Sequence, residues 1–341
     1  MNEKVWRKSY AALLLFLILL LSTTAIVSLG LGRLYIPIEE VVEILASYIW
    51  PLPQTWTDQA ASVIDTIRLP RVLAAVLIGA ALSLSGAAYQ SVFRNPLVAP
   101  DMLGVSSGAC VGASLGIIWG LPQTGVQLGA FAGGILAVSA AVLIPRLIGK
   151  NSVVMLVLAG IIVGGLMSSF LGIIKYSADT ETELPAITYW QLGALTNVTW
   201  DNLISSGLPI LACGIFMMLI RWKLNILTLS DEEIHMLENR SQWLRYAVIF
   251  CATVLTACSV CVSGTIGWVG LVIPHFSRML GGVDNRRLLP LSIILGALFL
   301  LVVDTLSRVA METEIPLSIL TGLIGAPFYF YLLVRQRMAL Q

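Results

Sequence analysis

The sequence feature that most constrains the fold is a succession of apolar runs of about the length that crosses a lipid bilayer. A spanning helix needs about 20 mostly apolar residues. The segment 267–280 fits least well, because it is short and contains Pro274, His275 and Arg278. The sequence predicts an all-α, polytopic transmembrane helical bundle. Its ten expected spans cover approximately residues 9–30, 69–90, 102–120, 126–147, 153–175, 201–221, 244–262, 267–280, 289–309 and 316–335.

The amino-acid composition is that of a chain embedded largely in the lipid bilayer. Only 11% of the 341 residues are charged and 57% are hydrophobic, whereas soluble domains carry about 25% charged residues. The formal net charge of +1 gives no reason to expect a nucleic-acid partner. No composition shift marks a domain boundary, so we predict a single transmembrane domain over residues 1–341.

The first apolar run also resembles the start of a secretory signal, because it follows Lys4, Arg7 and Lys8. The apolar core of a signal peptide is about 7–15 residues long. This run extends over about 19 residues, from Ala11 to Leu29, and no clear small-x-small cleavage site follows it. We interpret it as a retained first span.

The distribution of lysine and arginine predicts the orientation of the spans. Cytoplasmic loops carry an excess of these residues, and ten alternating spans place 15 of the 20 on the side that holds both termini. Both termini are therefore predicted to be cytoplasmic. The five basic residues left on the outer side are Arg33, Arg68, Arg71, Lys175 and Arg308.

Two long outer segments, 31–68 and 176–200, are rich in tryptophan and proline. Such composition favours interfacial or re-entrant elements over a separate folded domain.

Five glycines, each four residues apart, line the third expected span. Small residues at this spacing let a second helix approach closely. They predict a tightly packed bundle, and they say little about what the bundle carries. The glycines are Gly104, Gly108, Gly112, Gly116 and Gly120.

Motifs for covalent or metal chemistry are missing from the sequence. The Cys258-x-x-Cys261 pair lies in an apolar run, and buried thiols act as small hydrophobic groups. The segment Gly149-Lys150-Asn151-Ser152 lacks the first glycine and the Ser/Thr of a phosphate-binding loop. With two histidines in the chain, a histidine-rich metal site is excluded. We expect no enzyme activity and no cofactor bound by this chain.

Two polar clusters near the outer side have more than one interpretation. Asp304 and Arg308 share a helix face, so they could form the coupling site of an ion symporter or a simple structural pair near the helix end. Arg68 and Arg71 flank Leu69-Pro70. They could extend to the lipid headgroups or receive acidic residues of an extracytoplasmic partner.

A series of motifs from about residue 60 to the C-terminus resembles the FecCD family, the permeases of iron-siderophore, haem and vitamin B12 importers. The motifs occur in the order of that family. They are Arg68-Leu-Pro-Arg71, Gly79-Ala-Ala-Leu-Ser-Leu-Ser-Gly86, Phe93-Arg-Asn-Pro-Leu97, Ala99-Pro-Asp-Met-Leu-Gly-Val-Ser-Ser-Gly-Ala109, Gly264-Thr-Ile-Gly-Trp-Val-Gly-Leu-Val-Ile-Pro-His-Phe-Ser-Arg278, Asp304 with Arg308, Glu314-Ile-Pro-Leu317 and Gly325-Ala-Pro-Phe328.

The resemblance implies a permease domain of ten spans per subunit and a translocation path between two permease copies, identical or paralogous. It also implies two cytoplasmic ATP-binding-cassette ATPase subunits, which bind the ATP and Mg²⁺, and an external substrate-binding protein. By resemblance, Arg68, Arg71 and Arg308 receive acidic groups of that binding protein. The inner loop would contact the ATPase through the segment Leu229, Ser230, Asp231, Glu232, Glu233, Ile234, His235, Met236, Leu237 and Glu238.

Two positions depart from the family pattern. The usual Leu-Gly pair of the inner loop is absent, since Glu238 and Asn239 follow Leu237, and this leaves the end of the coupling helix open. Trp268 stands where relatives usually have phenylalanine.

The resemblance predicts an importer in the inner membrane of a prokaryote. It would work by alternating access, driven by the separate ATPase. An ion-coupled secondary transporter would instead show inverted repeats and midplane charges, and a membrane scaffold would carry a sizeable soluble domain. We find neither pattern. An iron-siderophore complex is the expected cargo from family frequency alone, with haem, cobalamin and molybdate as alternatives.

Overall fold

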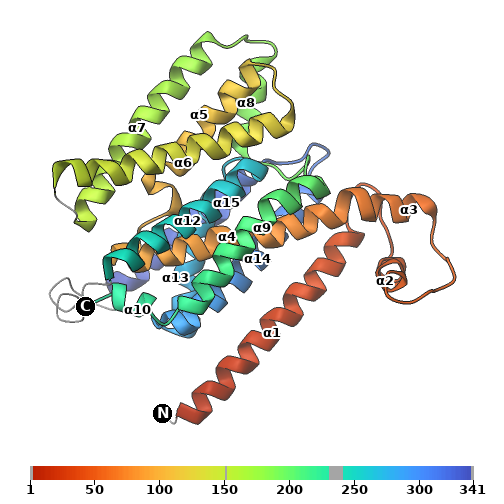
Figure 1. Cartoon of the computed structure of the whole chain (residues 1–341). Helices are drawn as coiled ribbons and strands as arrows, with labels where there is room; N and C mark the ends of the chain where they lie inside the picture. The colour runs from red at the N-terminus through yellow and green to blue at the C-terminus, as the bar shows by residue number, and fades with distance from the viewer. Residues whose placement is uncertain (1–2, 150–151, 230–240, 339–341) are drawn as a thin grey trace.

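The computed structural model describes residues 3–149, 152–229 and 241–338, and in these ranges every regular element is a helix. The longer helices run roughly side by side, with α4 and α12 in the middle layer and α6 and α7 beyond them on one side (Figure 1). Helix α1 lies on the opposite side. In chain order the ten helices that match the expected spans are α1 (Glu3–Gly30), α4 (Leu69–Phe93), α5 (Val105–Ile118), α6 (Gln123–Ile148), α7 (Val153–Ser177), α9 (Trp200–Ile220), α12 (Ser241–Ser263), α13 (Val269–Gly281), α14 (Asn285–Val309) and α15 (Leu317–Met338).

Short helices occupy the expected connecting segments. The first outer segment forms α2 (Ile38–Ser47) and α3 (Asp58–Val63), and the second forms α8 (Glu183–Leu192). The inner loop begins with α10 (Leu224–Leu227). In Figure 1, α10 and the start of α1 lie toward one end of the bundle, and α2 and α3 lie at the other.

Long-range hydrogen bonds connect helix ends that the predicted orientation assigns to the same side. At the inner end the Tyr10 hydroxyl donates to the Arg287 carbonyl over 3.0 Å. At the outer end the Trp200 indole donates to the Asp65 carbonyl over 2.8 Å, and the Ala194 amide donates to the Ser263 carbonyl over 2.8 Å. These contacts agree with alternating spans.

Helix α4 is the central element of the bundle. In the most apolar stretch of α4, as in that of α12, 78% of the residues are buried, against 17% in α1 and α9. Two glycines of α4 allow this. An added Cβ at Gly79 would overlap the Gly296 carbonyl of α14, and one at Gly86 would overlap the Gly270 carbonyl of α13. The backbones therefore touch, as expected where small residues line helix contacts in membranes.

The third and eighth expected spans differ from the other eight. In α5 there are 14 residues and in α13 there are 13, so each is only about 20 Å long, whereas the hydrocarbon core is about 30 Å thick. Seven of the described helices are long and apolar enough to cross a bilayer by themselves, and α5, α13 and α15 are not among them.

Non-helical segments complete the two short spans. The chain from Arg94 passes through a 3₁₀ turn, η2 (Pro100–Leu103), before α5 begins. Residues 264–268 similarly precede α13. Pro100 of the first segment lies against Gly270 at the start of α13, and Gly270 lies against Leu82 in the middle of α4. Both short helices therefore begin beside the middle of the bundle, because proline and glycine interrupt the helical hydrogen bonding there.

The glycine stripe of the third span divides into two groups. Gly108, Gly112 and Gly116 face α6, where an added Cβ would meet Gly133, Gly129 and Val126.

The end members of the stripe differ. Gly104 and Gly120 have φ angles of +81° and +63°, at the two ends of α5. Gly104 also approaches Gly164 of α7, but an added Cβ at Gly120 would meet no atom of the described residues within 4 Å. Gly120 therefore serves the turn that ends α5 rather than a helix contact.

The close contact between α5 and α6 predicts a strong effect of a side chain at Gly112. Replacing it by leucine forces the helices apart, and overpacking costs about 1–3 kcal/mol or more. We expect Gly112→Leu to lower the midpoint of thermal unfolding of the purified protein by several degrees. The matched control is Gly172→Leu in α7, where an added Cβ meets nothing within 4 Å. Equal midpoints for the two variants would contradict this account of the packing.

Candidate functional site

The predicted docking arginines lie in a charged network at the outer end of the bundle. Arg71 at the start of α4 donates through Nε to Asp304 of α14 over 2.9 Å. Its two terminal nitrogens donate to the Glu314 carboxylate over 3.0 and 2.9 Å. Arg308 places its Nε 3.2 Å from the second Asp304 oxygen. Two arginines and two carboxylates therefore neutralise one another.

Burial makes this neutralisation necessary. The exposed fraction of the Asp304 side chain is 0%, and those of Arg71 and Arg308 are 5% and 7%. An isolated charge in such surroundings would cost several kcal/mol. The Asp304–Arg308 pair thus lies at one end of the bundle, tied to Arg71, which agrees with the structural interpretation and not with a midplane coupling site.

Arg68 and Arg308 hold the end of α1. The last carbonyl groups of a helix lack partners within the helix. Arg68 donates to the carbonyls of Leu29 and Gly30 over 2.6 and 3.0 Å, and to that of Leu34. Arg308 donates to the Ser28 hydroxyl over 2.7 Å. Cations beside a helix C-terminus are also favoured by the helix dipole.

A local widening of the helix places Arg68. Pro70 has no amide hydrogen and would clash with the carbonyl of the preceding turn in a regular helix. The chain instead forms a π-turn, η1 (Ile64–Arg68), in which the Leu69 amide donates to the Ile64 carbonyl. A π-turn is a rare feature that often occurs at functional sites. Arg68 and Arg71 consequently point inward, one to α1 and the other to α14.

Glu314 is the member of the network that reaches solvent, with 31% of its side chain exposed. Partial burial raises the pKa of its carboxyl group, but the hydrogen bonds and charge of Arg71 outweigh this effect. A further bond from the Thr196 hydroxyl, 2.9 Å long, acts in the same direction as Arg71. The pKa of Glu314 therefore lies below its ordinary value, and the group is ionised at neutral pH.

The docking role of Arg68, Arg71 and Arg308 stays a prediction. The structure shows which existing contacts a docking carboxylate would have to replace. All three guanidinium groups already have internal partners. An incoming carboxylate must compete with Asp304, Glu314 or the carbonyls of α1.

Arg33 is a further basic residue of this outer end. It is exposed and donates to the Glu312 carbonyl over 2.6 Å. The sequence marks it only as one of the five basic outer residues, because no motif surrounds it.

A second candidate site is a polar pocket of about 490 Å³ on the side of α4 that faces α5 and α7. It includes Leu82 in the middle of α4 and the starts of the short helices α5 and α13. Hydroxyl and amide groups contribute to its lining, beside apolar side chains such as Leu82 and Leu271. These groups come from Ser106, Ser107, Ser168, Gln191, Thr256, Thr265 and Ser318, and Asp101 adds one carboxylate to the lining.

Trp268 lines the same pocket with a strained backbone. Its φ angle is +69°, which is unusual for any residue but glycine and a genuine outlier for a bulky one. The ring lies against Gly322 and Gly325 of α15, which have no side chains to obstruct it. Strain of this kind is retained only where the surroundings enforce it, and it clusters at functional sites.

The sequence signal for this pocket is present but ambiguous. In the sequence, the motifs around Ser106 and Trp268 indicate only the family. They do not predict a pocket, because hydropathy does not show that a helix begins halfway across the bundle.

The predicted coupling segment Ser230, Asp231, Glu232, Glu233, Ile234, His235, Met236, Leu237 and Glu238 lies outside the described residues, and only Leu229 is described. The structure does define the base of this loop. Arg94, at the end of α4, donates to the Leu227 carbonyl over 3.1 Å. Asn225 donates to Asp284, just before α14, over 2.7 Å. Helix α10 is therefore fastened to two long helices.

The outer network predicts a large cost for removing its central charge. Asp304→Asn leaves Arg71 and Arg308 with one carboxylate between them, and breaking a buried ion pair costs about 3–5 kcal/mol. We expect a marked fall in the thermal unfolding midpoint of the purified protein.

The control for this prediction is Glu312→Gln, which removes an exposed carboxylate from the same loop as Glu314. It should leave the midpoint nearly unchanged. If Asp304→Asn were as stable as Glu312→Gln, the network would have no structural role.

Comparisons with known proteins agree with the fold and the motifs. The family model described as "FecCD transport family" matches residues 16–335. The molybdate import system permease protein MolB of Haemophilus influenzae is 40% identical over 321 residues, which cover 94% of this chain and 95% of that protein. The hemin transport system permease protein HmuU of Yersinia pestis is 38% identical, over 80% of this chain and 83% of that protein.

A solved structure of a metal-chelate type ABC transporter in an inward-facing conformation also matches. Its TM-score is 0.86 at 38% identity, and the match covers 95% of this chain and 99% of that one. The motif order, the helical bundle and these similarities lead to one assignment. The chain belongs to the FecCD transport family, and it is a multi-pass permease subunit of an ABC importer in the cytoplasmic membrane, in which a partner ATPase hydrolyses the ATP.

Proposed function

We propose that this permease imports a metal in an oxygen-rich, anionic form, either a ferric siderophore or molybdate. The observation that carries the proposal is the pocket beside Trp268, whose lining offers hydroxyl and amide groups. Such groups bind oxygen-rich surfaces weakly and reversibly, as a path requires. The siderophore is the cargo expected from the family resemblance. Molybdate is favoured by the similarity to MolB.

The starts of the two short helices favour an anionic cargo, and they offset the negative charge that Asp101 brings to the same lining. The amino end of a helix carries a partial positive charge and free amide hydrogens. Both α5 and α13 begin at this pocket. A broken helix that presents its amino end to a midplane site is also a recurrent device of membrane transporters.

We propose that the path runs along this pocket and is closed on its open side by a second permease copy, identical or paralogous. Ser168 of α7 is an exposed member of the lining, so another chain can complete the enclosure. Trp268, held in its strained conformation by α15, is then a candidate gate between outward-open and inward-open states. Packed elements of this kind switch between two arrangements rather than deform continuously.

The two ends of the bundle supply the proposed partner surfaces. An external binding protein docks at the outer end, where Arg68, Arg71 and Arg308 either exchange their partners for its acidic groups or hold the surface in shape. At the inner end, the loop from Leu229 to Glu238 contacts the ATPase. The base of this loop at α10 transmits the movement of the ATPase to α4 and α14. ATP and Mg²⁺ bind only to the ATPase in this scheme.

Uptake by the complete complex tests the proposal. Proteoliposomes would contain this chain, its ATPase and its binding protein, with ATP on the ATPase side. Radiolabelled ferric siderophore, molybdate, haem and cobalamin would be offered in parallel. We expect uptake of the siderophore or of molybdate that requires ATP and ignores a protonophore.

The matched control is the same complex with a hydrolysis-defective ATPase, which should show binding without accumulation. Uptake of haem or cobalamin alone would overturn the proposed cargo class. Uptake that continues without ATP and collapses with the protonophore would overturn the proposed coupling.

A further inference from the structure

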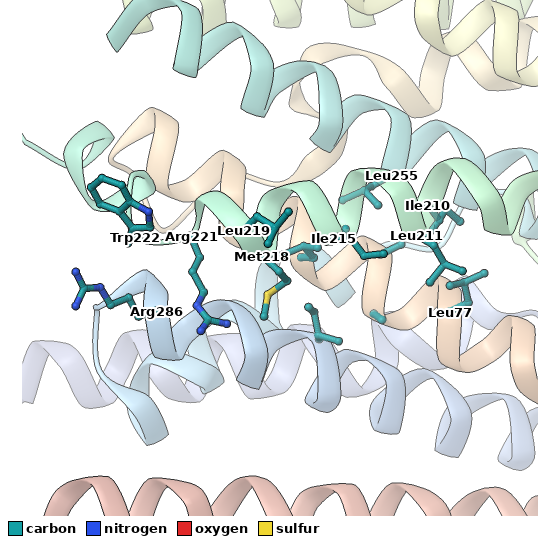
Figure 2. Close-up of a pocket in the computed structure, with 15 residues that line it drawn as sticks. Leu77, Ile210, Leu211, Ile215, Met218, Leu219, Arg221, Trp222, Leu255 and Arg286 are labelled. Atoms are coloured by element: carbon teal, nitrogen blue, oxygen red, sulfur yellow. The ribbon is translucent and has the colours of Figure 1, made fainter. Parts of the chain in front are cut away.

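A second cavity lies on the other side of α4 and α12 from the polar pocket. It is a groove of about 830 Å³ along α9, closed at the back by α4, α12 and α14. Its floor includes Leu77, Leu84 and Leu255, and its outer wall comes from residues of α9 such as Leu211 and Ile215. Figure 2 shows apolar side chains arranged along the groove.

The inner end of the groove is basic. Arg221, at the end of α9, and Arg286, at the start of α14, both line it, and Trp222 lies beside them (Figure 2). Within residues 3–149, 152–229 and 241–338, neither guanidinium group makes a hydrogen bond or an ion pair. The nearby carboxylate of Asp284 accepts hydrogen bonds from Asn225 and from the Arg286 backbone amide, 2.7 and 3.0 Å long.

The apolar length and basic inner end of the groove match the acyl chain and phosphate of an anionic phospholipid. The apolar wall of α9 is exposed, with 53% of Leu211 and 59% of Ile215 accessible, so the groove opens where lipid chains lie. Two arginines at the cytoplasmic end provide charge-assisted hydrogen bonds for a phosphate. Basic pockets between spanning helices on this side of a membrane bind anionic headgroups. Tryptophan is typical of the headgroup level.

We propose that the groove binds one anionic glycerophospholipid of the inner leaflet, with an acyl chain along α9 and the phosphate between Arg221 and Arg286. A second copy of this chain fits the groove less well, because a symmetric contact would bring the same arginines of both copies together and their positive charges would repel. The site is separate from the proposed path, since it lies on the opposite face of α4. The bound lipid ties the end of α9 to the start of α14.

Lipid retention by the purified full chain tests this site. The protein would be exchanged into detergent containing palmitoyl-oleoyl phosphatidylglycerol or the phosphatidylcholine with the same chains, and bound lipid would be counted by native mass spectrometry. We expect retention of phosphatidylglycerol over phosphatidylcholine. Basic residues at this level favour anionic headgroups, so Arg221→Gln combined with Arg286→Gln should weaken the binding of phosphatidylglycerol about tenfold or more.

Two further variants separate the site from general surface charge. Arg146→Gln, at the inner end of α6, removes a charge from the same inner side but not from the groove lining, and retention should be unchanged. Gly214→Leu fills the groove without touching the arginines, and retention should fall. The thermal midpoint of the unmutated chain should also rise with phosphatidylglycerol more than with phosphatidylcholine. Equal retention of both lipids by that chain, or an equal loss in Arg146→Gln, would overturn the proposal.

Discussion

The backbone contacts of α4 with α14 and α13 are the constraint on which the other features depend. In a bilayer there is no hydrophobic force between helices, so association rests on close packing and polar contacts. Gly79 against Gly296 and Gly86 against Gly270 supply the closest approach. The first contact aligns the outer ends of α4 and α14, which brings the charged network together. The second places the start of α13 beside the middle of α4.

The same packing separates two faces with different chemistry. One side of α4 holds the hydroxyl-lined pocket, and the other holds the apolar groove with its basic end. The charged network closes the outer end of the bundle, and the Arg94 and Asn225 contacts fasten the base of the inner loop. Polar contacts thus fix the helices to one another at both ends of the bundle. The strained Trp268 lies between these ends, where a transporter has to switch between two conformations.

Hydropathy and charge predict the positions of all ten helices, because apolarity and the lysine and arginine bias are properties of sequence alone. They mark the segment of α13 as short, but they cannot show that α5 is short or how deep either helix begins, since a window of apolar residues reports composition and not depth. The ion-pair partners of Arg71 cannot be predicted from the sequence either, since Glu314 is 243 positions away. The motif around Arg71 is compatible both with a side chain that extends to the headgroups and with one that forms ion pairs inside the bundle. Among the described residues no helix contacts Gly120, and the sequence does not show this, because regular spacing does not distinguish a helix contact from a turn.

The measurement that most directly tests the central claim, that the cargo passes along the pocket beside Trp268, is cysteine labelling in the complete complex. In a chain without its five native cysteines, Ser107→Cys would be treated with a membrane-impermeant maleimide during ATP turnover with the binding protein present. Leu211→Cys on the lipid-facing side of α9 is the control. The account predicts labelling at position 107 that changes with the nucleotide state, and none at position 211. No labelling at position 107 in any nucleotide state would contradict it.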